Sequence, residues 1–228
     1  LFQTLDMDAR LIGRDEIEAK FPIVNLDGVL GGLFDPQEGH LDPHGTTHAF
    51  VIAARNLGAK TILRNRVTNL TQLPDKSWRI TTEKGELTAE HVINAAGLWA
   101  RRVGRMAGVN LPLVPMEHHY LVTESIPELA ALDSEMPSVT DLDGFTYLQQ
   151  EGTGVLLGIY ERNPVHWRPQ GADWDFGMDL LPEDIDRIEH ELLVGFERFP
   201  ALQNIGIKRW VNGAFTFTPD GNPLIGPV

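Results

Sequence analysis

The chain has 228 residues, 42% of them apolar, so it can bury a core as one large domain or as two small interleaved ones. Its formal net charge is -13, and its 19 basic residues form no stripe, which argues against nucleic acid as a partner. The absence of cysteine excludes disulfides, thiolate metal sites and a cysteine nucleophile, and it favours the cytoplasm. No apolar run approaches the roughly 18 residues of a membrane span, so we expect no membrane partner.

The first half of the chain predicts two helices followed by extended segments. Residues 14–21 carry apolar side chains four apart and predict a short helix. Asp42 as N-cap and Pro43 in the first turn predict a longer helix, which ends at Gly58. Alternating apolar and polar residues then predict three strands, and the last part of the third is apolar on both faces, as in a buried strand: 60–73, 77–82 and 85–96.

The second half changes from a helix to antiparallel strands. Residues 99–107 place apolar side chains on one face and predict a helix that leaves the sheet. Three strands separated by turn residues, which we expect to be neighbours in one sheet, follow at 118–124, 144–150 and 154–161. Beyond them the sequence predicts a loop, a helix, a last strand and a turn, at 163–181, 182–199, 206–217 and 218–223.

The stretch "NAAGLW", residues 94–99, packs small residues between the predicted buried strand and the helix after it. Ala95, Ala96 and Gly97 leave room for a ligand against main-chain N–H groups at the start of a helix, where anions are favoured. The alternative is that small residues merely let the strand and the helix pack closely. The turn alone does not decide between these interpretations.

Four separated segments supply the context, and they follow one another along the chain at 35–62, 66–70, 92–124 and 211–227. In this order they resemble segments of amine-oxidising flavoproteins related to D-amino-acid oxidase, and the last two look like stretches shared by dimethylglycine and sarcosine dehydrogenases. The resemblance covers only the middle of that family's catalytic domain, and the G-x-G-x-x-G turn that receives the FAD pyrophosphate does not occur here. We therefore expect a central fragment of an enzyme, which should not retain FAD well alone.

The resemblance implies an α/β (α+β) fold. It predicts a partial FAD-binding, Rossmann-like domain interleaved with a substrate-binding domain that is built on an antiparallel sheet. The expected boundaries are 41–108 plus 213–228 for the first domain and 1–40 plus 109–212 for the second.

The resemblance also implies which residues lie beside FAD. The small residues of "NAAGLW" would have the cofactor next to them, and the backbone of Val67 would meet the adenine edge. The turn at Asp220 and Gly221 would lie close to the flavin, although its own composition is equally typical of a surface turn. The complete predicted set is Val67, Ala95, Ala96, Gly97, Trp99, Asp220 and Gly221.

The implied reaction is oxidation of the C–N bond of a small N-methylated amino acid, dimethylglycine or sarcosine, with hydride transfer to flavin and demethylation. The implied partners are the amine, an electron acceptor, which is oxygen or an electron-transfer protein, and a possible folate-binding domain in the full-length chain. An ammonium ion cannot give up a hydride, so the enzyme needs a group that titrates near neutrality, for which histidine is the natural candidate.

His118 falls at the position of the family's active-site histidine, and His119 points to the other face if this segment is a strand. The resemblance makes His118 and Tyr147 the catalytic candidates. Without it, they would be an ordinary strand histidine and a plain sheet aromatic. Tyr160 and Arg162 are the substrate-binding candidates, because a hydroxyl and a guanidinium suit a carboxylate.

Two alternatives come from other classes of protein. The residues His40, Asp42, His44 and His48 cluster in sequence, and His44 and His48 have the i, i+4 spacing of metal ligands, which would fit a metal-dependent hydrolase. Asp42, however, is already explained as an N-cap, and the resemblance accounts for this segment with no metal site. The other alternative is a non-catalytic binding module that uses the tryptophan-rich stretch at 165–176 and the acidic surface.

Overall fold

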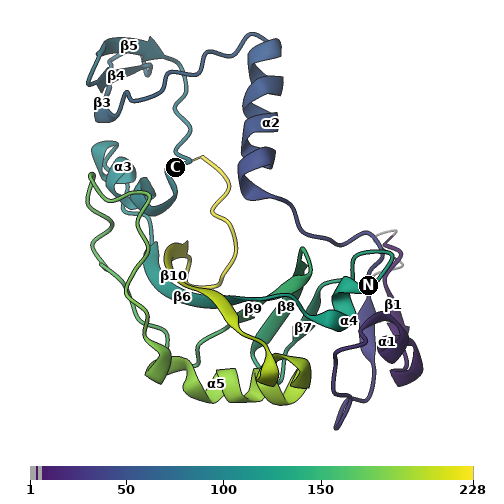
Figure 1. The fold of residues 1–228 in the computed structure, drawn as a ribbon. Helices are drawn as coiled ribbons and strands as arrows, with labels where there is room; N and C mark the ends of the chain where they lie inside the picture. The colour runs from purple at the N-terminus through teal and green to yellow at the C-terminus, as the bar shows by residue number, and fades with distance from the viewer. Residues whose placement is uncertain (1–3, 5–6, 228) are drawn as a thin grey trace. The chain divides into compact units, whose positions relative to one another are not determined.

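The computed structural model describes residues 4 and 7–227, and the ends of the predicted domains at residues 1 and 228 lie outside them (Figure 1). The chain divides into two compact units. Unit 1 comprises Leu1–Leu41, His118–Pro164 and Leu180–Gly213, and unit 2 comprises Asp42–Glu117, Val165–Asp179 and Ala214–Val228. Segments 109–117 and 165–179, which the sequence analysis assigned to the substrate-binding domain, cluster with unit 2.

Most of a five-stranded sheet of order β10-β6-β9-β8-β7 belongs to unit 1. Its strands are β6 (Val114–Thr123), β7 (Val139–Asp141), β8 (Thr146–Glu151), β9 (Gly154–Ile159) and β10 (Ile207–Phe217). The pairs β6–β9, β9–β8 and β8–β7 are antiparallel. The prediction that the three strands after residue 117 are neighbours in one sheet is therefore confirmed.

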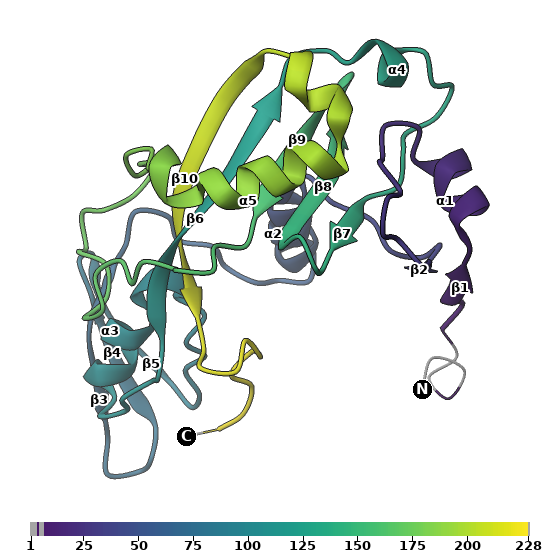
Figure 2. The same ribbon diagram turned by 90° about the horizontal axis from the view of Figure 1, so that it is seen from below.

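Helix α5 (Ile185–Arg198) lies across one face of this sheet (Figure 2). It buries Ile188 and Leu192 at helical spacing, as the sequence predicted. Gly195 lets α5 pack closely against β9, because a Cβ at this position would lie only 3.1 Å from a methyl carbon of Leu157 on β9. The core beneath α5 includes the fully buried side chains of Leu121, Leu148, Leu157, Ile159 and Phe199.

Shorter elements complete unit 1. The predicted first helix is α1 (Arg14–Lys20), and its Ile17 joins the same apolar core. The remaining elements are β1 (Arg10–Ile12), β2 (Gly32–Phe34), α4 (Pro127–Ala130) and the 3₁₀ helix η3 (Pro200–Asn204). β1 and β2 pair as an antiparallel ribbon.

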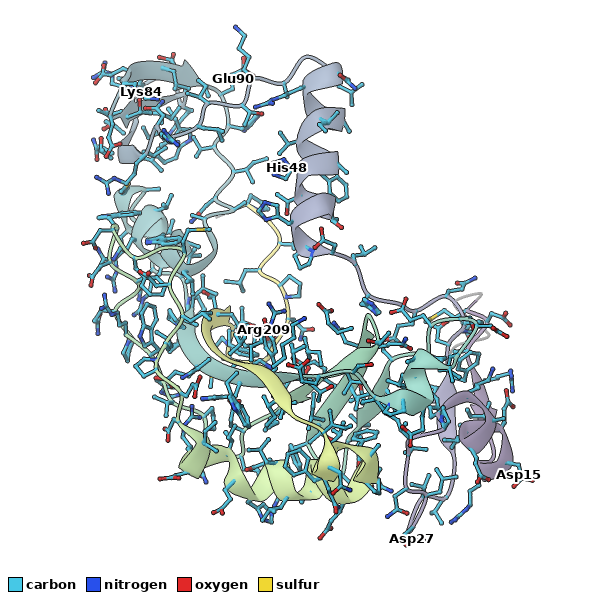
Figure 3. All side chains as sticks on the ribbon, viewed as in Figure 1. Asp15, Asp27, His48, Lys84, Glu90 and Arg209 are labelled. Atoms are coloured by element: carbon cyan, nitrogen blue, oxygen red, sulfur yellow. The ribbon has the colours of Figure 1, made fainter. Side chains whose placement is uncertain are left out.

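Unit 2 begins with α2 (Pro43–Asn56), capped as predicted by the Asp42 carboxylate, which accepts the Gly45 N–H. Gly58 has a φ of +94°, which suits the chain reversal after the helix. An antiparallel sheet of order β3-β4-β5 follows, and Lys84 lies in its second turn (Figure 3). Its strands are β3 (Val67–Gln72), β4 (Trp78–Thr82) and β5 (Gly85–Ala89), and η2 (Gly97–Trp99) and α3 (Ala100–Met106) come next. No helix among the described residues is long and apolar enough to cross a membrane.

Two predicted strands are shorter than expected. The strand predicted at 60–73 begins only at Val67, where its pairing with β4 starts. The strand predicted at 85–96 ends at Ala89, and beyond it Ile93 is 89% exposed, so the prediction of a buried strand is wrong for this structure. A strand that is apolar on both faces needs neighbours at its edges and layers on its faces, and no described strand pairs with residues 90–96.

Candidate functional site

The register of the sheet in unit 1 brings aromatic residues of different strands to one face. Gly158 on β9 lies opposite Tyr120 on one side and opposite Tyr147 on the other. Side chains alternate along a strand, so His118 shares a face with Tyr120, and Tyr160, just beyond β9, follows the face of Gly158. Sequence positions 118, 147 and 160 thus meet at one place on the sheet.

The rings of His118, Tyr147 and Tyr160 form a three-ring cluster. The centroid distances are 6.0 Å from His118 to Tyr147, 5.5 Å from His118 to Tyr160 and 5.3 Å between the tyrosines. The imidazole and the Tyr147 ring are nearly parallel, at 8°. The Tyr147 Oη lies 3.2 Å from His118 Nε2, within hydrogen-bonding distance.

The carboxylate of Glu161, which the sequence analysis did not single out, contacts both histidines of β6. Its Oε1 accepts the backbone N–H of His119 at 2.8 Å and lies 3.0 Å from that residue's Nδ1. Its Oε2 lies 3.3 Å from His118 Nδ1. The Glu161 side chain is 5% exposed and that of His118 is 14% exposed.

His119 points to the core face, as the strand alternation predicted, and it is fully buried. The backbone N–H of Asp184, the N-cap residue of α5, donates to His119 Nε2 at 3.3 Å. Nε2 therefore accepts this hydrogen bond. The guanidinium of Arg187 adds positive charge beside this pair, with Nη2 3.2 Å from His119 Nδ1.

The surroundings set the charges of the cluster. Burial would raise the pKa of Glu161, but the hydrogen bonds from His118 and His119 outweigh it and lower this pKa to about 2. Burial, together with nearby Tyr160, Tyr120 and Glu161, raises the pKa of Tyr147 to about 12. At neutral pH the carboxylate of Glu161 is therefore ionised. The phenol of Tyr147 keeps its proton and can donate a hydrogen bond to His118.

The lowered pKa of Glu161 predicts a pH-dependent contribution to stability. A carboxyl group with a depressed folded-state pKa stabilises the fold above its unfolded value, about 4.3, and loses this contribution as the pH falls toward 2. We expect Glu161→Gln to lower the thermal midpoint at pH 5 to 7, and the difference from wild type to shrink below about pH 4.3. Thermal unfolding of both proteins across this pH range measures the difference between their midpoints. A difference that is independent of pH would contradict the prediction.

Arg162 and Tyr160, the predicted substrate-binding residues, are both partly exposed. The Arg162 backbone N–H donates to the buried carboxylate of Glu191 at 3.3 Å, and its guanidinium lies 4.8 Å from the ring centre of Phe145. Tyr160 is 47% exposed and belongs to the three-ring cluster. The structure thus joins Tyr160 to His118 and Tyr147, and it gives Arg162 other partners.

The residues predicted to lie beside FAD belong to unit 2. In the "NAAGLW" turn, Ala95 and Gly97 are exposed and Ala96 is half-buried. Gly97 has a φ of +53°, and a Cβ there would meet no described atom within 4 Å, so backbone conformation and not close packing requires the glycine. The main chain is therefore open to a ligand at Gly97, whereas the Ala96 N–H already donates to the side-chain oxygen of Asn94 at 3.3 Å.

The other predicted cofactor residues have ordinary structural roles in this chain. The Trp99 indole N–H donates to the carbonyl oxygen of Asp173 at 2.8 Å. Val67 opens β3, and the register shifts just after it. The Asp220 carboxylate accepts the backbone N–H of Asn222 at 3.1 Å and closes the predicted turn, with Gly221 at a φ of +73°. Their role in binding FAD stays a prediction.

The histidine-rich segment does not form a metal site. Within the described part of the chain, no group of three or more histidine, cysteine, aspartate or glutamate residues could hold a metal ion. His48 extends from α2 (Figure 3) with its ring centre 5.1 Å from that of His44, while His40 lies 3.0 Å from Glu135. The Asp42 carboxylate is occupied as the cap of α2. The metal-dependent hydrolase alternative is therefore not supported.

Comparisons with known proteins identify relatives of this chain. The chain is 40% identical over 222 residues to mouse mitochondrial dimethylglycine dehydrogenase, a match that covers 95% of this chain and 26% of that protein. It is 36% identical over 225 residues to mouse mitochondrial sarcosine dehydrogenase, covering 96% of this chain and 24% of that one. The chain thus spans about a quarter of the length of these curated relatives.

A solved structure and a family model extend these comparisons. The crystal structure of L-proline dehydrogenase from P. horikoshii matches with a TM-score of 0.82 and 26% identity, over 99% of this chain and 57% of that one. This likeness confirms the predicted α/β (α+β) fold class. The model of the "FAD dependent oxidoreductase" family matches residues 2–228. The chain therefore belongs to the family of FAD-dependent oxidoreductases.

Proposed function

We propose that the complete protein uses FAD to oxidise the C–N bond of a small N-methylated amino acid, dimethylglycine or sarcosine. The observation that carries the proposal is the cluster of His118, Tyr147 and Tyr160, with an imidazole and a phenol in hydrogen-bonding contact in a member of this family. Its similarity to dimethylglycine and sarcosine dehydrogenases supports the choice of substrate.

The residues of the cluster have distinct roles in this proposal. His118 Nε2 accepts the proton of the substrate ammonium, because an amine must be neutral before its neighbouring carbon can lose a hydride. The Tyr147 hydroxyl donates a hydrogen bond to the same nitrogen before the substrate enters, and it then holds the amine in place. Tyr160 offers an exposed ring to the methylated ammonium, and Arg162 offers a guanidinium to the carboxylate.

In this proposal FAD lies beside the open turn in unit 2. The main chain at Ala95, Ala96 and Gly97 and the residues Val67, Trp99, Asp220 and Gly221 would hold it. When bound, FAD supplies an acceptor for the hydride that leaves the carbon next to nitrogen. Water then converts the iminium ion of the substrate into the demethylated amine and an aldehyde.

The proposal also includes partners and a compartment. The partners are the amine, an electron acceptor, which is oxygen or an electron-transfer protein, and a folate-binding domain elsewhere in the complete chain. The absence of cysteine favours the cytoplasm, whereas the mouse relatives are described as mitochondrial. Fractionation of cells that produce the complete reading frame distinguishes these compartments.

The test is the visible spectrum of the protein expressed from its complete reading frame, followed by anaerobic addition of dimethylglycine and, separately, sarcosine. We expect the bands of oxidised flavin, and we expect one of the two amines to bleach them. L-proline, which lacks an N-methyl group, serves as the comparison amine. A colourless protein despite supplied FAD would favour the non-catalytic alternative, and bleaching by L-proline alone would overturn the proposed substrate class.

A further inference from the structure

A single buried carboxylate holds two neighbouring imidazoles that point to opposite faces of the sheet in unit 1. His119 lies opposite Ile159, so Glu161, two residues further on, continues the core face that His119 occupies. Because Glu161 comes just after the end of β9, its side chain also reaches His118 on the other face. Each carboxylate oxygen serves one ring, Oε1 for His119 and Oε2 for His118.

Contacts on the core face of the sheet hold the carboxylate of Glu161 in position. The backbone N–H and the Nδ1 of His119 both contact Oε1, at 2.8 and 3.0 Å. The His119 ring is held in turn by the Asp184 N–H at the start of α5. A chain of contacts therefore runs from α5 through the buried His119 to the carboxylate, and it leaves Oε2 directed at His118.

The position of Oε2 decides the tautomer of neutral His118. An ionised carboxylate only accepts hydrogen bonds, so the Nδ1 that faces it at 3.3 Å must carry the proton. Nε2 is then the acceptor nitrogen, and the Tyr147 hydroxyl lies 3.2 Å from it. In the opposite tautomer an N–H group at Nε2 would face the tyrosine, and this nitrogen could accept nothing from an amine.

We infer that Glu161 is a positioning residue, which holds His118 in the Nδ1–H tautomer so that Nε2 is the basic atom presented to the substrate amine. The inference rests on the proposed function in assigning the base to His118. Glu161 acts through the ring and does not touch the substrate. The pKa of Glu161 is lowered to about 2, so at neutral pH its carboxylate only accepts hydrogen bonds.

The tautomer can be observed without turnover. In the protein from the complete reading frame, with histidine rings labelled with ¹⁵N, two-bond ¹H–¹⁵N spectra distinguish an Nδ1–H ring from an Nε2–H ring. Comparison with His118→Asn assigns the signals of His118. We expect the Nδ1–H pattern in the wild-type protein and its loss in Glu161→Gln. An Nε2–H pattern for His118 in the wild-type protein would overturn the inference.

Kinetics provide the second test, through anaerobic flavin reduction by the amine that bleaches the protein. We expect Glu161→Gln to lower the limiting reduction rate by about 10 to 100-fold, the range for losing a group that orients a metal-binding histidine, with little change in amine affinity. In a His118→Asn background, the same substitution should have no further effect, because Glu161 acts through that ring. A purely structural role would instead give losses that multiply.

Asp141→Asn is the matched control. Asp141 is a partly buried carboxylate of unit 1 that binds the Arg198 guanidinium at 2.8 Å, so its loss tests general damage to the fold. We expect it to leave the His118 tautomer and the reduction rate unchanged. If His118→Asn slows reduction and Glu161→Gln does not, the inference alone fails. If no amine reduces the flavin, the proposed function fails, and the spectra still decide the role of Glu161.

Discussion

Replacing His118 by Asn is expected to slow flavin reduction by an N-methylated amine at neutral pH by about 10² to 10⁴-fold, the range for loss of a general base. Asparagine keeps polar atoms near Glu161 and Tyr147 but cannot accept a proton from an ammonium ion. The amine should therefore still bind, and its conversion to the reactive neutral form should fail. Anaerobic stopped-flow reduction, at several amine concentrations, separates the reduction rate from the affinity.

The pH dependence gives this prediction a sharper test. Above the pKa of the free amine, the substrate arrives neutral, and the rates of the variant and the wild-type protein should converge. His190→Asn is the control, because His190 is an exposed histidine on α5, away from the three-ring cluster. An unchanged reduction rate in His118→Asn at neutral pH would remove this residue from the mechanism.

Replacing Gly158 by Ala is expected to displace the ring of Tyr147. The two residues face each other in the β8–β9 register, and a Cβ at Gly158 would overlap the ring at Cζ, Cε1 and Oη. The tyrosine must move and lose its contact with His118 Nε2. We expect a loss of about 1 to 3 kcal/mol in unfolding free energy, typical of overpacking, and of about 10²-fold in reduction rate from misplacement of the group.

Two further variants isolate the cause. Adding Tyr147→Ala to Gly158→Ala removes the overlap and should restore the unfolding free energy lost to it, but not the reduction rate. Gly177→Ala is the control, because a Cβ at Gly177 meets no described atom within 4 Å and its φ is not positive. Wild-type reduction by Gly158→Ala would contradict the placement of Tyr147 in the site.

Local patterns in the sequence predicted most of the elements. α2 follows from an N-cap, a first-turn proline and a terminal glycine, and α5 from apolar residues at helical spacing, which are interactions within a few residues. The predictions of strand at residues 90–96 and 60–66 are wrong for the opposite reason. A segment forms a strand only when it pairs with another strand. Which strand pairs with a segment cannot be read from the residues of that segment alone.

The candidate site also has features that the sequence predicted and features that only the tertiary structure revealed. The sequence by itself determined the family resemblance, the position of His118 and the opposite orientation of His119, because motif order and strand alternation can be read directly from the residues. Only the tertiary structure decided that Tyr147 and Tyr160 meet His118, since this depends on the register of three strands. It also decided the importance of Glu161. A carboxylate at the end of an apolar strand was the sole sequence signal, and its two histidine partners lie 42 and 43 residues away, brought within reach only by the pairing of β6 with β9.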